Sequence, residues 1–253
     1  MIHLHRPPKP KELTEKEEEL TLIFLNEKKD VWNKTYIKIK LLEMSYSKCC
    51  YCETKLTEES KYMTVDHYHH KEEYPHEVVE WNNLLPACSR CNSNKGNHNT
   101  YKEPIINPVS QNPTDYFYIS NYRYRSKDKI INSIARMTID VLGLNDSKKI
   151  VEVRFKIGEE LCEKIAEFYN KAIKYVNNNI DNIPLRNRIV TGVKNILRQA
   201  QPDAEYSGTM ATVIINDAEY IQLKIILENL NLWDDELNQL HKVAESIKYD
   251  IKQ

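Results

Sequence analysis

The sequence predicts an α+β protein, with a small cysteine-rich core between N-terminal helices and a mostly α-helical C-terminal half. Apolar residues recur at helical spacing towards both ends of the chain, and this periodicity stops between residues 47 and 100. Within that interval, Met63-Thr64-Val65 and Leu84-Leu85 are typical of two short paired strands. Two Cys-x-x-Cys pairs in the same interval indicate a metal site in place of a larger apolar core.

The composition excludes several classes of protein. A formal net charge of −1 over 253 residues argues against a surface that binds nucleic acid everywhere, so phosphate contacts must come from local basic patches. Only 5 glycines are present, and no glycine-rich phosphate loop is visible. Apolar runs end within a few residues, so we expect a cytoplasmic protein with no membrane partner. Four of the six cysteines lie in paired motifs, which fits metal binding in a reducing cytosol better than disulfides.

Residues 1–46 are predicted to form an N-terminal arm and helices. The first twelve residues carry three prolines and mixed charge, which indicates an extended arm. A helix is expected to begin near Thr14, because Thr14-x-x-Glu17 matches a capping box before apolar residues. The apolar pattern continues to Leu42 with an expected break near Asn33.

Residues 47–100 hold the chemistry. Two pairs at knuckle spacing, Cys49/Cys52 and Cys88/Cys91, can close a four-thiolate zinc site of structural type. The 35 residues between the pairs exceed the spacing of common zinc ribbons, so the segment contains an insert. Cys50 and Cys162 are interpreted as packed, free thiols. A short helix is expected from Ser89, its plausible cap, to His98.

The insert and the helix carry groups suited to phosphodiester hydrolysis, which needs a base for water and a cation for the charge that builds up on phosphate. His67 can be the base, since a neutral imidazole is available near pH 7. Asp66 and Asn92 offer hard oxygen ligands for Mg²⁺ or Mn²⁺. Asn83 is interpreted as a brace for the loop that orients His67.

Residues 101–130 are expected to be an irregular connector, because three prolines interrupt the first part. Residues 131–253 are expected to be helical. The expected helices are Ser133 to Leu142, Asp146 or Ser147 to about Asn177, Pro184 to Leu197, about Asn216 to Leu230, and Asp234 to Ile251.

These motifs resemble an HNH nuclease with the ββα-metal fold and a four-cysteine zinc knuckle. The matching positions are Cys49-x-x-Cys52, Asp66-His67, Asn83-Leu84, Cys88-x-x-Cys91-Asn92 and Lys95-Gly96. The resemblance implies that His67 is the general base and that Asp66 is the metal-binding acid before it. It also implies that Asn92 completes the metal site and that Asn83 positions the base.

A narrower resemblance is to the HNH component of Septu-type anti-phage systems (PtuB-like), also found with some retrons. It rests on Tyr51-Cys52-Glu53, Lys71, Tyr74-Pro75, Trp81-Asn82-Asn83-Leu84-Leu85 and Ala87-Cys88. It implies an ABC-like ATPase partner (PtuA-like) and, in retrons, a reverse transcriptase with its ncDNA. The sequence departs from the family at His69-His70, where related sequences often carry Pro before the Lys.

The hypothesis is therefore a metal-dependent HNH endonuclease that serves a defence complex. Lys71, Arg90 and Lys95 are predicted to contact backbone phosphates, and residues 131–253 are predicted to dock the ATPase. Two alternatives stay open. The substrate is DNA or a structured RNA such as tRNA, because no feature of the sequence distinguishes ribose from deoxyribose. The cysteines alone also fit a non-catalytic zinc-stapled adaptor, although the Asp, His and two Asn in register favour the nuclease.

Overall fold

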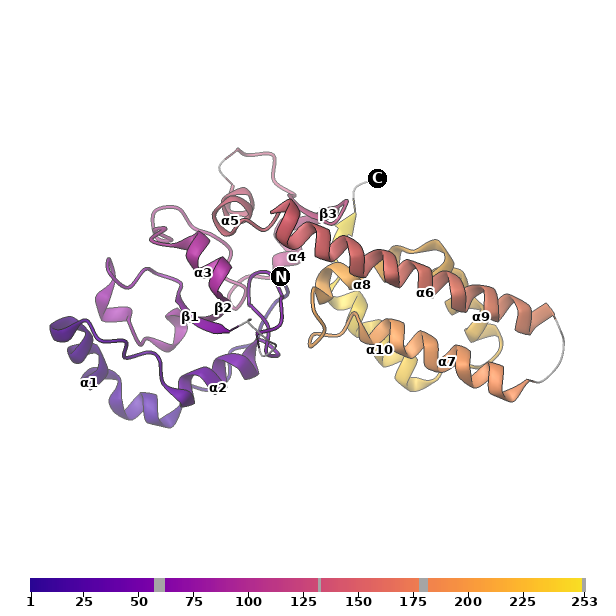
Figure 1. The fold of residues 1–253 in the computed structure, drawn as a ribbon, viewed down its shortest axis with the longest axis horizontal. Coiled ribbons are helices and arrows are strands. Elements are labelled where there is room, and N and C mark those ends of the chain that lie inside the picture. The colour runs from indigo at the N-terminus through magenta and orange to yellow at the C-terminus, as the bar shows by residue number, and fades with distance from the viewer. Residues whose placement is uncertain (57–61, 132, 178–181, 252–253) are drawn as a thin grey trace. The chain divides into compact units, whose positions relative to one another are not determined.

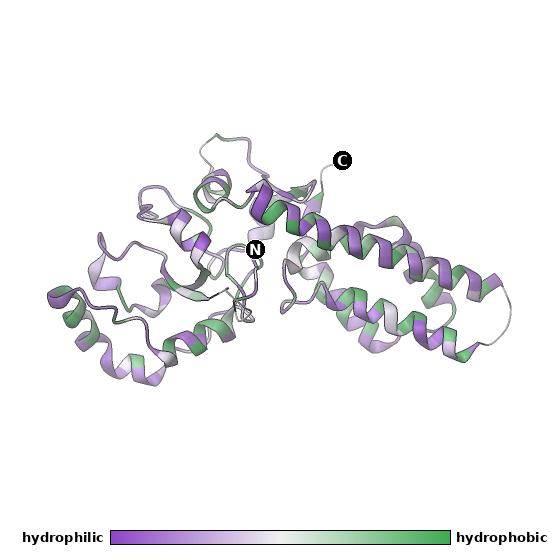
Figure 2. Ribbon diagram, in the orientation of Figure 1, coloured by the Kyte–Doolittle hydropathy of each residue, from purple (hydrophilic) through white to green (hydrophobic). Residues whose placement is uncertain are grey.

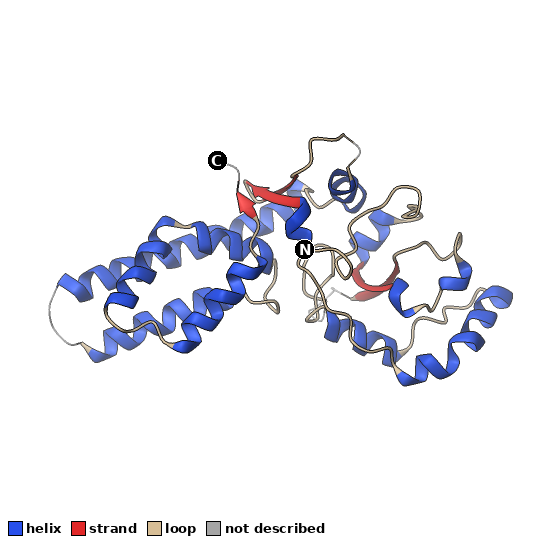
Figure 3. Ribbon diagram, turned by 180° about the vertical axis from the view of Figure 1, so that it is seen from behind, coloured by secondary structure: helices blue, strands red, loops and turns tan. Residues whose placement is uncertain are grey.

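The chain forms two compact units. The computed structural model describes residues 1–56, 62–131, 133–177 and 182–251. Unit 1 comprises Met1–Phe117 and Tyr124–Asn145, and unit 2 comprises Tyr118–Arg123 and Asp146–Gln253. Helices predominate and the strands are short (Figures 1 and 3). Among the described residues, no helix combines the length and the apolar character that crossing a membrane requires.

Unit 1 begins with an arm that is tied to the later core. The Arg6 guanidinium donates to the carbonyl oxygens of Trp81 and Leu84 at 2.6 and 3.0 Å, and the Trp81 indole donates to Pro7 O at 3.0 Å. The arm leads into α1 (Lys11–Glu27) and α2 (Thr35–Met44), so the predicted break near Asn33 is confirmed.

The predicted start of α1 at a Thr14 capping box is wrong. The helix begins at Lys11, with Pro10 at the N-cap position and no side-chain cap. The Thr14 hydroxyl donates to Pro10 O at 3.2 Å, one turn back, because Thr14 already lies inside the helix.

The centre of unit 1 is a hairpin followed by a helix. Strand β1 (Met63–His67) pairs antiparallel with β2 (Leu84–Cys88), with His67 opposite Leu84, as the sequence predicts. The connection contains the 3₁₀ turns η1 (Pro75–Glu77) and η2 (Trp81–Asn83). Helix α3 (Ser89–Lys95) follows β2 directly and packs on both strands (Figure 1).

The N-cap of α3 is not the predicted Ser89 but Cys88. The Cys88 sulfur accepts the backbone N–H of Cys91 at 3.4 Å, so one cysteine both caps the helix and belongs to the paired motif.

The rest of unit 1 supports α3. Helix α4 (Pro113–Tyr116) and β4 (Arg123–Ser126, of which Arg123 belongs to unit 2) precede α5 (Ile134–Leu142). Helix α5 is capped by Ser133 and ends at a left-handed Gly143, close to the predicted boundaries. Helix α5 packs on α3, and the Asn94 amide donates to Leu142 O at 3.1 Å. A Cβ at Gly143 would lie 2.7 Å from the Asn94 amide nitrogen, so this contact requires glycine.

Unit 2 is a helical bundle with one strand pair. Its elements are β3 (Phe117–Ser120, of which Phe117 belongs to unit 1), η3 (Ser147–Val151), α6 (Glu152–Asn177), α7 (Ile183–Arg198), α8 (Ser207–Asn216), α9 (Ala218–Asn229), α10 (Asp235–Ile247) and β5 (Asp250–Ile251). Strand β5 pairs parallel with β3. Helix α6 packs against α7, α8 and α9, and α10 packs against α7 and α8. The α+β class is confirmed.

Helix α8 is absent from the sequence prediction. Most of its side chains are buried, including Thr209, Met210 and Ile214 at 0% exposure. A helix that is buried nearly all round lacks the polar face from which helical periodicity is recognised. Helices α6 and α7 do show alternating hydrophobic and hydrophilic residues (Figure 2), and the sequence predicts both.

Candidate active site

The four paired cysteines converge. The sulfur atoms of Cys49, Cys52, Cys88 and Cys91 all lie within 4.8 Å of one another, and the Cys52 and Cys88 sulfurs are 3.7 Å apart. Sulfurs placed 2.3 Å from a tetrahedral zinc ion would be separated by about 3.8 Å. This donor set therefore fits Zn²⁺ in a closed site of structural type, with one pair after α2 and the other at the junction of β2 and α3.

Arg90, predicted to contact a phosphate, faces this sulfur cluster. Its guanidinium donates to the Cys91 sulfur at 3.3 Å and to Gly143 O at 3.5 Å. Burial alone would lower the pKa of Arg90, but the charge of the Cys91, Cys52 and Cys88 thiolates raises it. Arg90 thus faces the negative charge of the cluster and is not among the lining residues of the cavity at Asp66 and His67. The predicted free thiols, Cys50 and Cys162, lie outside the cluster.

Asp66 is held between two buried donors. The Tyr51 hydroxyl donates to Asp66 Oδ2 at 2.6 Å, and the Lys95 ammonium donates to Asp66 Oδ1 at 3.0 Å and to His67 O at 2.5 Å. Burial raises the pKa of Tyr51, so its hydroxyl keeps the proton that it donates. Lys95 is only 3% exposed, so it fixes the carboxylate from inside the fold and offers no exposed charge to a phosphate.

His67 ends β1 with one ring nitrogen engaged. Its Nε2 lies 2.9 Å from Val78 O. A carbonyl oxygen can only accept, so Nε2 carries the hydrogen and Nδ1 keeps the lone pair of a base. Burial lowers the pKa of His67 to about 4, so the imidazole is neutral at pH 7.

Asn83 does not contact the His67 ring. Its amide oxygen accepts the His69 N–H at 2.6 Å, while its amide nitrogen donates to His69 O at 3.0 Å and to Glu77 O at 3.1 Å. These three bonds fix the loop just before Val78, whose carbonyl orients His67. Asn83 thus braces the loop whose Val78 carbonyl contacts the His67 ring.

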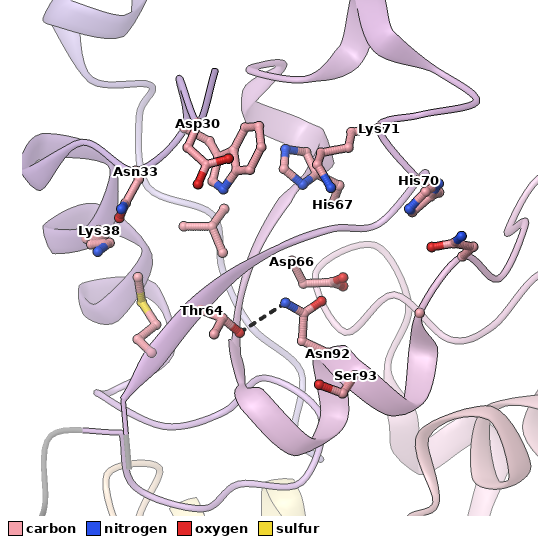
Figure 4. Close-up of a pocket in the computed structure, with 15 residues that line it drawn as sticks. Asp30, Asn33, Lys38, Thr64, Asp66, His67, His70, Lys71, Asn92 and Ser93 are labelled. Carbon is pink, nitrogen blue, oxygen red and sulfur yellow. Dashed lines mark hydrogen bonds between the residues drawn. The ribbon is translucent and has the colours of Figure 1, made fainter. Parts of the chain in front are cut away.

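Asp66, His67 and Asn92 meet at one cavity of about 470 Å³. The Asn92 amide nitrogen donates to Thr64 Oγ1 at 3.2 Å, and Asn92 and Asp66 both line the cavity (Figure 4). Lys71 also lines the cavity. Of the three predicted phosphate-binding residues, Lys71 alone lies at this cavity.

The same cavity has lining residues that the sequence analysis missed, namely Asp30, Trp32, Asn33, Lys38 and His70. The first four come from the α1–α2 segment, outside the cysteine-rich region. No motif joins them to Asp66-His67 in the sequence, so only the folded chain reveals them. Tyr51 was also missed as a partner of Asp66, although its place between Cys49 and Cys52 brings it near the site.

Comparison with known proteins agrees with this geometry. A family model for HNH endonucleases matches residues 49–98, the segment that holds the four cysteines and the cavity residues of β1 and α3. The fold and the site thus define an HNH endonuclease. The Septu protein PtuB of Bacillus thuringiensis is 42% identical over 245 residues, which cover 97% of this chain and 94% of that protein. The chain belongs to the PtuB family, as its resemblance predicts.

The sulfur cluster predicts one zinc ion per chain. Cys91→Ser removes a ligand, so we expect the purified variant to lose its zinc, measured by plasma mass spectrometry. Cys162→Ser, a thiol of unit 2, serves as the control and should retain the metal. Equal zinc content in both variants would contradict the assignment.

The buried Lys95–Asp66 ion pair predicts a large loss of stability in Lys95→Met. The substitution leaves a buried carboxylate without its counter-charge, which costs about 3–5 kcal/mol in the free energy of unfolding. Urea denaturation followed by tryptophan fluorescence measures the change. The control Lys102→Met, at an exposed position, should stay within about 0.5 kcal/mol. A loss below about 1 kcal/mol in Lys95→Met would show that the pair is dispensable.

Proposed function

We propose that this HNH endonuclease hydrolyses nucleic-acid phosphodiester bonds with His67 as the general base. The observation that carries the proposal is the hydrogen bond from His67 Nε2 to Val78 O, which leaves Nδ1 unprotonated at the cavity that Asp66 and Asn92 also line. A base must be neutral at the working pH, and the lowered pKa of His67 meets that condition.

We further propose that Asp66 and Asn92 hold the catalytic Mg²⁺ or Mn²⁺. Both offer hard oxygens, which suit these ions, and each carboxylate oxygen of Asp66 keeps a lone pair after accepting one hydrogen bond. When bound, the ion supplies positive charge against the negative charge that grows on the phosphate and the leaving oxygen.

The other steps of the reaction fall to side chains of the protein. His67 Nδ1 takes a proton from the attacking water, and the Nε2–H bond to Val78 O stabilises the resulting imidazolium. Asn83 keeps the Val78 loop in place, and Lys95 keeps Asp66 oriented. Lys71, at the cavity wall, attracts the phosphate backbone.

We predict that His67→Ala and Asn92→Ala each lower the cleavage rate in Mg²⁺ by about 10²–10⁴-fold, because they remove the base or a metal ligand. A plasmid and a tRNA-sized RNA are both offered as substrates, so the assay also identifies the nucleic acid. Asn82→Ala, an exposed amide next to Asn83, is the matched control and should cut normally. Unchanged cutting by both site variants would remove the assignment. Wild-type protein inert towards every nucleic acid, even with partner and ATP, would favour an adaptor.

We propose that the protein serves anti-phage defence together with a PtuA-like ATPase. The similarity to a Septu protein covers unit 2 as well as the HNH core, which supports a shared assembly and not only a shared reaction. Four of the six cysteines form a metal-type cluster and none is in a disulfide, which supports a reducing cytoplasm. Helix α9 exposes Ile221 (44%) and Ile225 (42%) one turn apart, so unit 2 has an apolar stripe suited to docking a protein.

Docking through α9 predicts that the double substitution Ile221→Lys and Ile225→Lys abolishes co-purification of the ATPase. Both side chains are exposed, so the fold should tolerate the charges. Leu22→Lys, at an exposed apolar position of α1 in unit 1 (58%), controls for added charge and should keep the partner. Mass spectrometry of the captured proteins distinguishes an ATPase from a reverse transcriptase. Survival of the complex in the double variant would rule out this surface.

A further inference from the structure

The active-site cavity has a wall that lies outside the HNH motif. Four side chains of the α1–α2 segment line the cavity together with residues of β1 and α3: Asp30, Trp32, Asn33 and Lys38. Figure 4 labels Asp30, Asn33 and Lys38 at this wall. The HNH match begins only at residue 49, so these side chains are no part of that motif.

Trp32 joins this wall to the base and to a lysine. Its ring meets the His67 ring edge-on, with 4.7 Å between centroids and an interplanar angle of 89°. The Lys71 ammonium lies 5.2 Å from the Trp32 ring centroid, within cation–π range. Trp32 also contacts the buried Phe24 of α1, with 5.8 Å between the ring centroids. The α1–α2 segment is thereby held in a fixed place next to His67.

Lys38 supplies a positive charge at this wall. It is half-buried on α2, and no carboxylate within residues 1–56, 62–131, 133–177 and 182–251 forms an ion pair with it. Lys71 and Lys38 therefore place two ammonium groups around the cavity in which the scissile phosphate would lie. A polyanionic backbone has phosphates at regular intervals, so it can engage several such cations at once.

His70 adds a second sign that the cavity is built for a ligand. Its side chain is 9% exposed and lines the cavity, and Nδ1 is buried with no hydrogen-bond partner in the described part of the chain. Buried polar atoms are nearly always satisfied. A ligand with several hydrogen-bonding oxygens, such as a sugar-phosphate, would bring bonding partners to this part of the cavity.

Asp30 opposes a phosphate at the same wall. Its side chain is exposed, so water and salt screen its charge more strongly than that of the half-buried Lys38. Neutralising Lys38 should therefore weaken the binding of a polyanion, whereas neutralising Asp30 should strengthen it.

We propose that the α1–α2 segment is a backbone-binding subsite of the nuclease, in which Lys38 binds a nucleic-acid phosphate next to the scissile one. This subsite rests on the proposed nuclease function. It extends the substrate site beyond the HNH core to helices that precede the first cysteine in the chain.

Binding of the full chain to fluorescein-labelled duplex DNA and to single-stranded RNA in Mg²⁺-free buffer tests the subsite over a range of KCl concentrations. One phosphate contact contributes about 0.9 to the slope of log K against log salt on duplex DNA, and about 0.7 on a single strand. Lys38→Gln should lower the slope by that amount on the true substrate, and Asp30→Asn should tighten binding. Lys40→Gln, on another face of α2 and paired with Glu43, is the control and should leave the slope unchanged.

The outcomes separate the subsite from the enzyme. Wild-type protein that binds and cuts, with Lys38→Gln indistinguishable from Lys40→Gln in slope, overturns the subsite and leaves the nuclease standing. Wild-type protein that neither binds nor cuts DNA or RNA overturns the proposed function and the subsite with it. Weaker binding by Asp30→Asn would show that the wall does not recognise an anion.

Discussion

The convergence of four cysteine sulfurs is the constraint on which the rest of unit 1 depends. It joins the loop after α2 to the junction of β2 and α3, although 35 residues separate the two pairs. Between the cysteines of the first pair, Tyr51 reaches Asp66 with its hydroxyl. From the helix that follows the second pair, Lys95 reaches the same carboxylate. The residues that flank the cluster therefore hold the Asp66 carboxylate from two directions.

The pairing register of β1 and β2 gives Asp66 and His67 different surroundings, although both residues line the same cavity. Successive side chains on a strand point to opposite faces. Asp66 turns towards the buried donors Tyr51 and Lys95, whereas His67 turns towards Val78 and Trp32. A slip of one residue in the pairing would exchange the two environments, placing the imidazole against an ammonium and the carboxylate against an indole edge.

Much of the fold and the centre of the site could be predicted from the sequence. Short-range patterns succeeded: the cysteine spacing, the apolar strand before Asp66-His67, and the Ser133 and Gly143 boundaries of α5. The sequence could not show the surroundings of side chains whose neighbours come from distant parts of the chain. In the sequence, Lys95 and Arg90 both resemble phosphate-binding cations. In the fold, Lys95 is buried against Asp66 and Arg90 faces the Cys91 sulfur. The contact of Trp32 with His67 joins distant parts of the chain, so no local sequence pattern predicts it. Helix α8 is buried on nearly all sides, so it lacks the amphipathic pattern that predicts a helix.

The attachment of the arm through Arg6 makes the order of synthesis matter. Its acceptors, the carbonyl groups of Trp81 and Leu84, lie some 75 residues further along the chain, and Cys91 follows them. The arm, α1 and α2 leave the ribosome before β2 has been synthesised. The arm therefore cannot form its bonds to Trp81 and Leu84 at that stage. The contacts of the arm thus form only after Leu84 has left the ribosome, and the sulfur cluster forms only after Cys91 has done so.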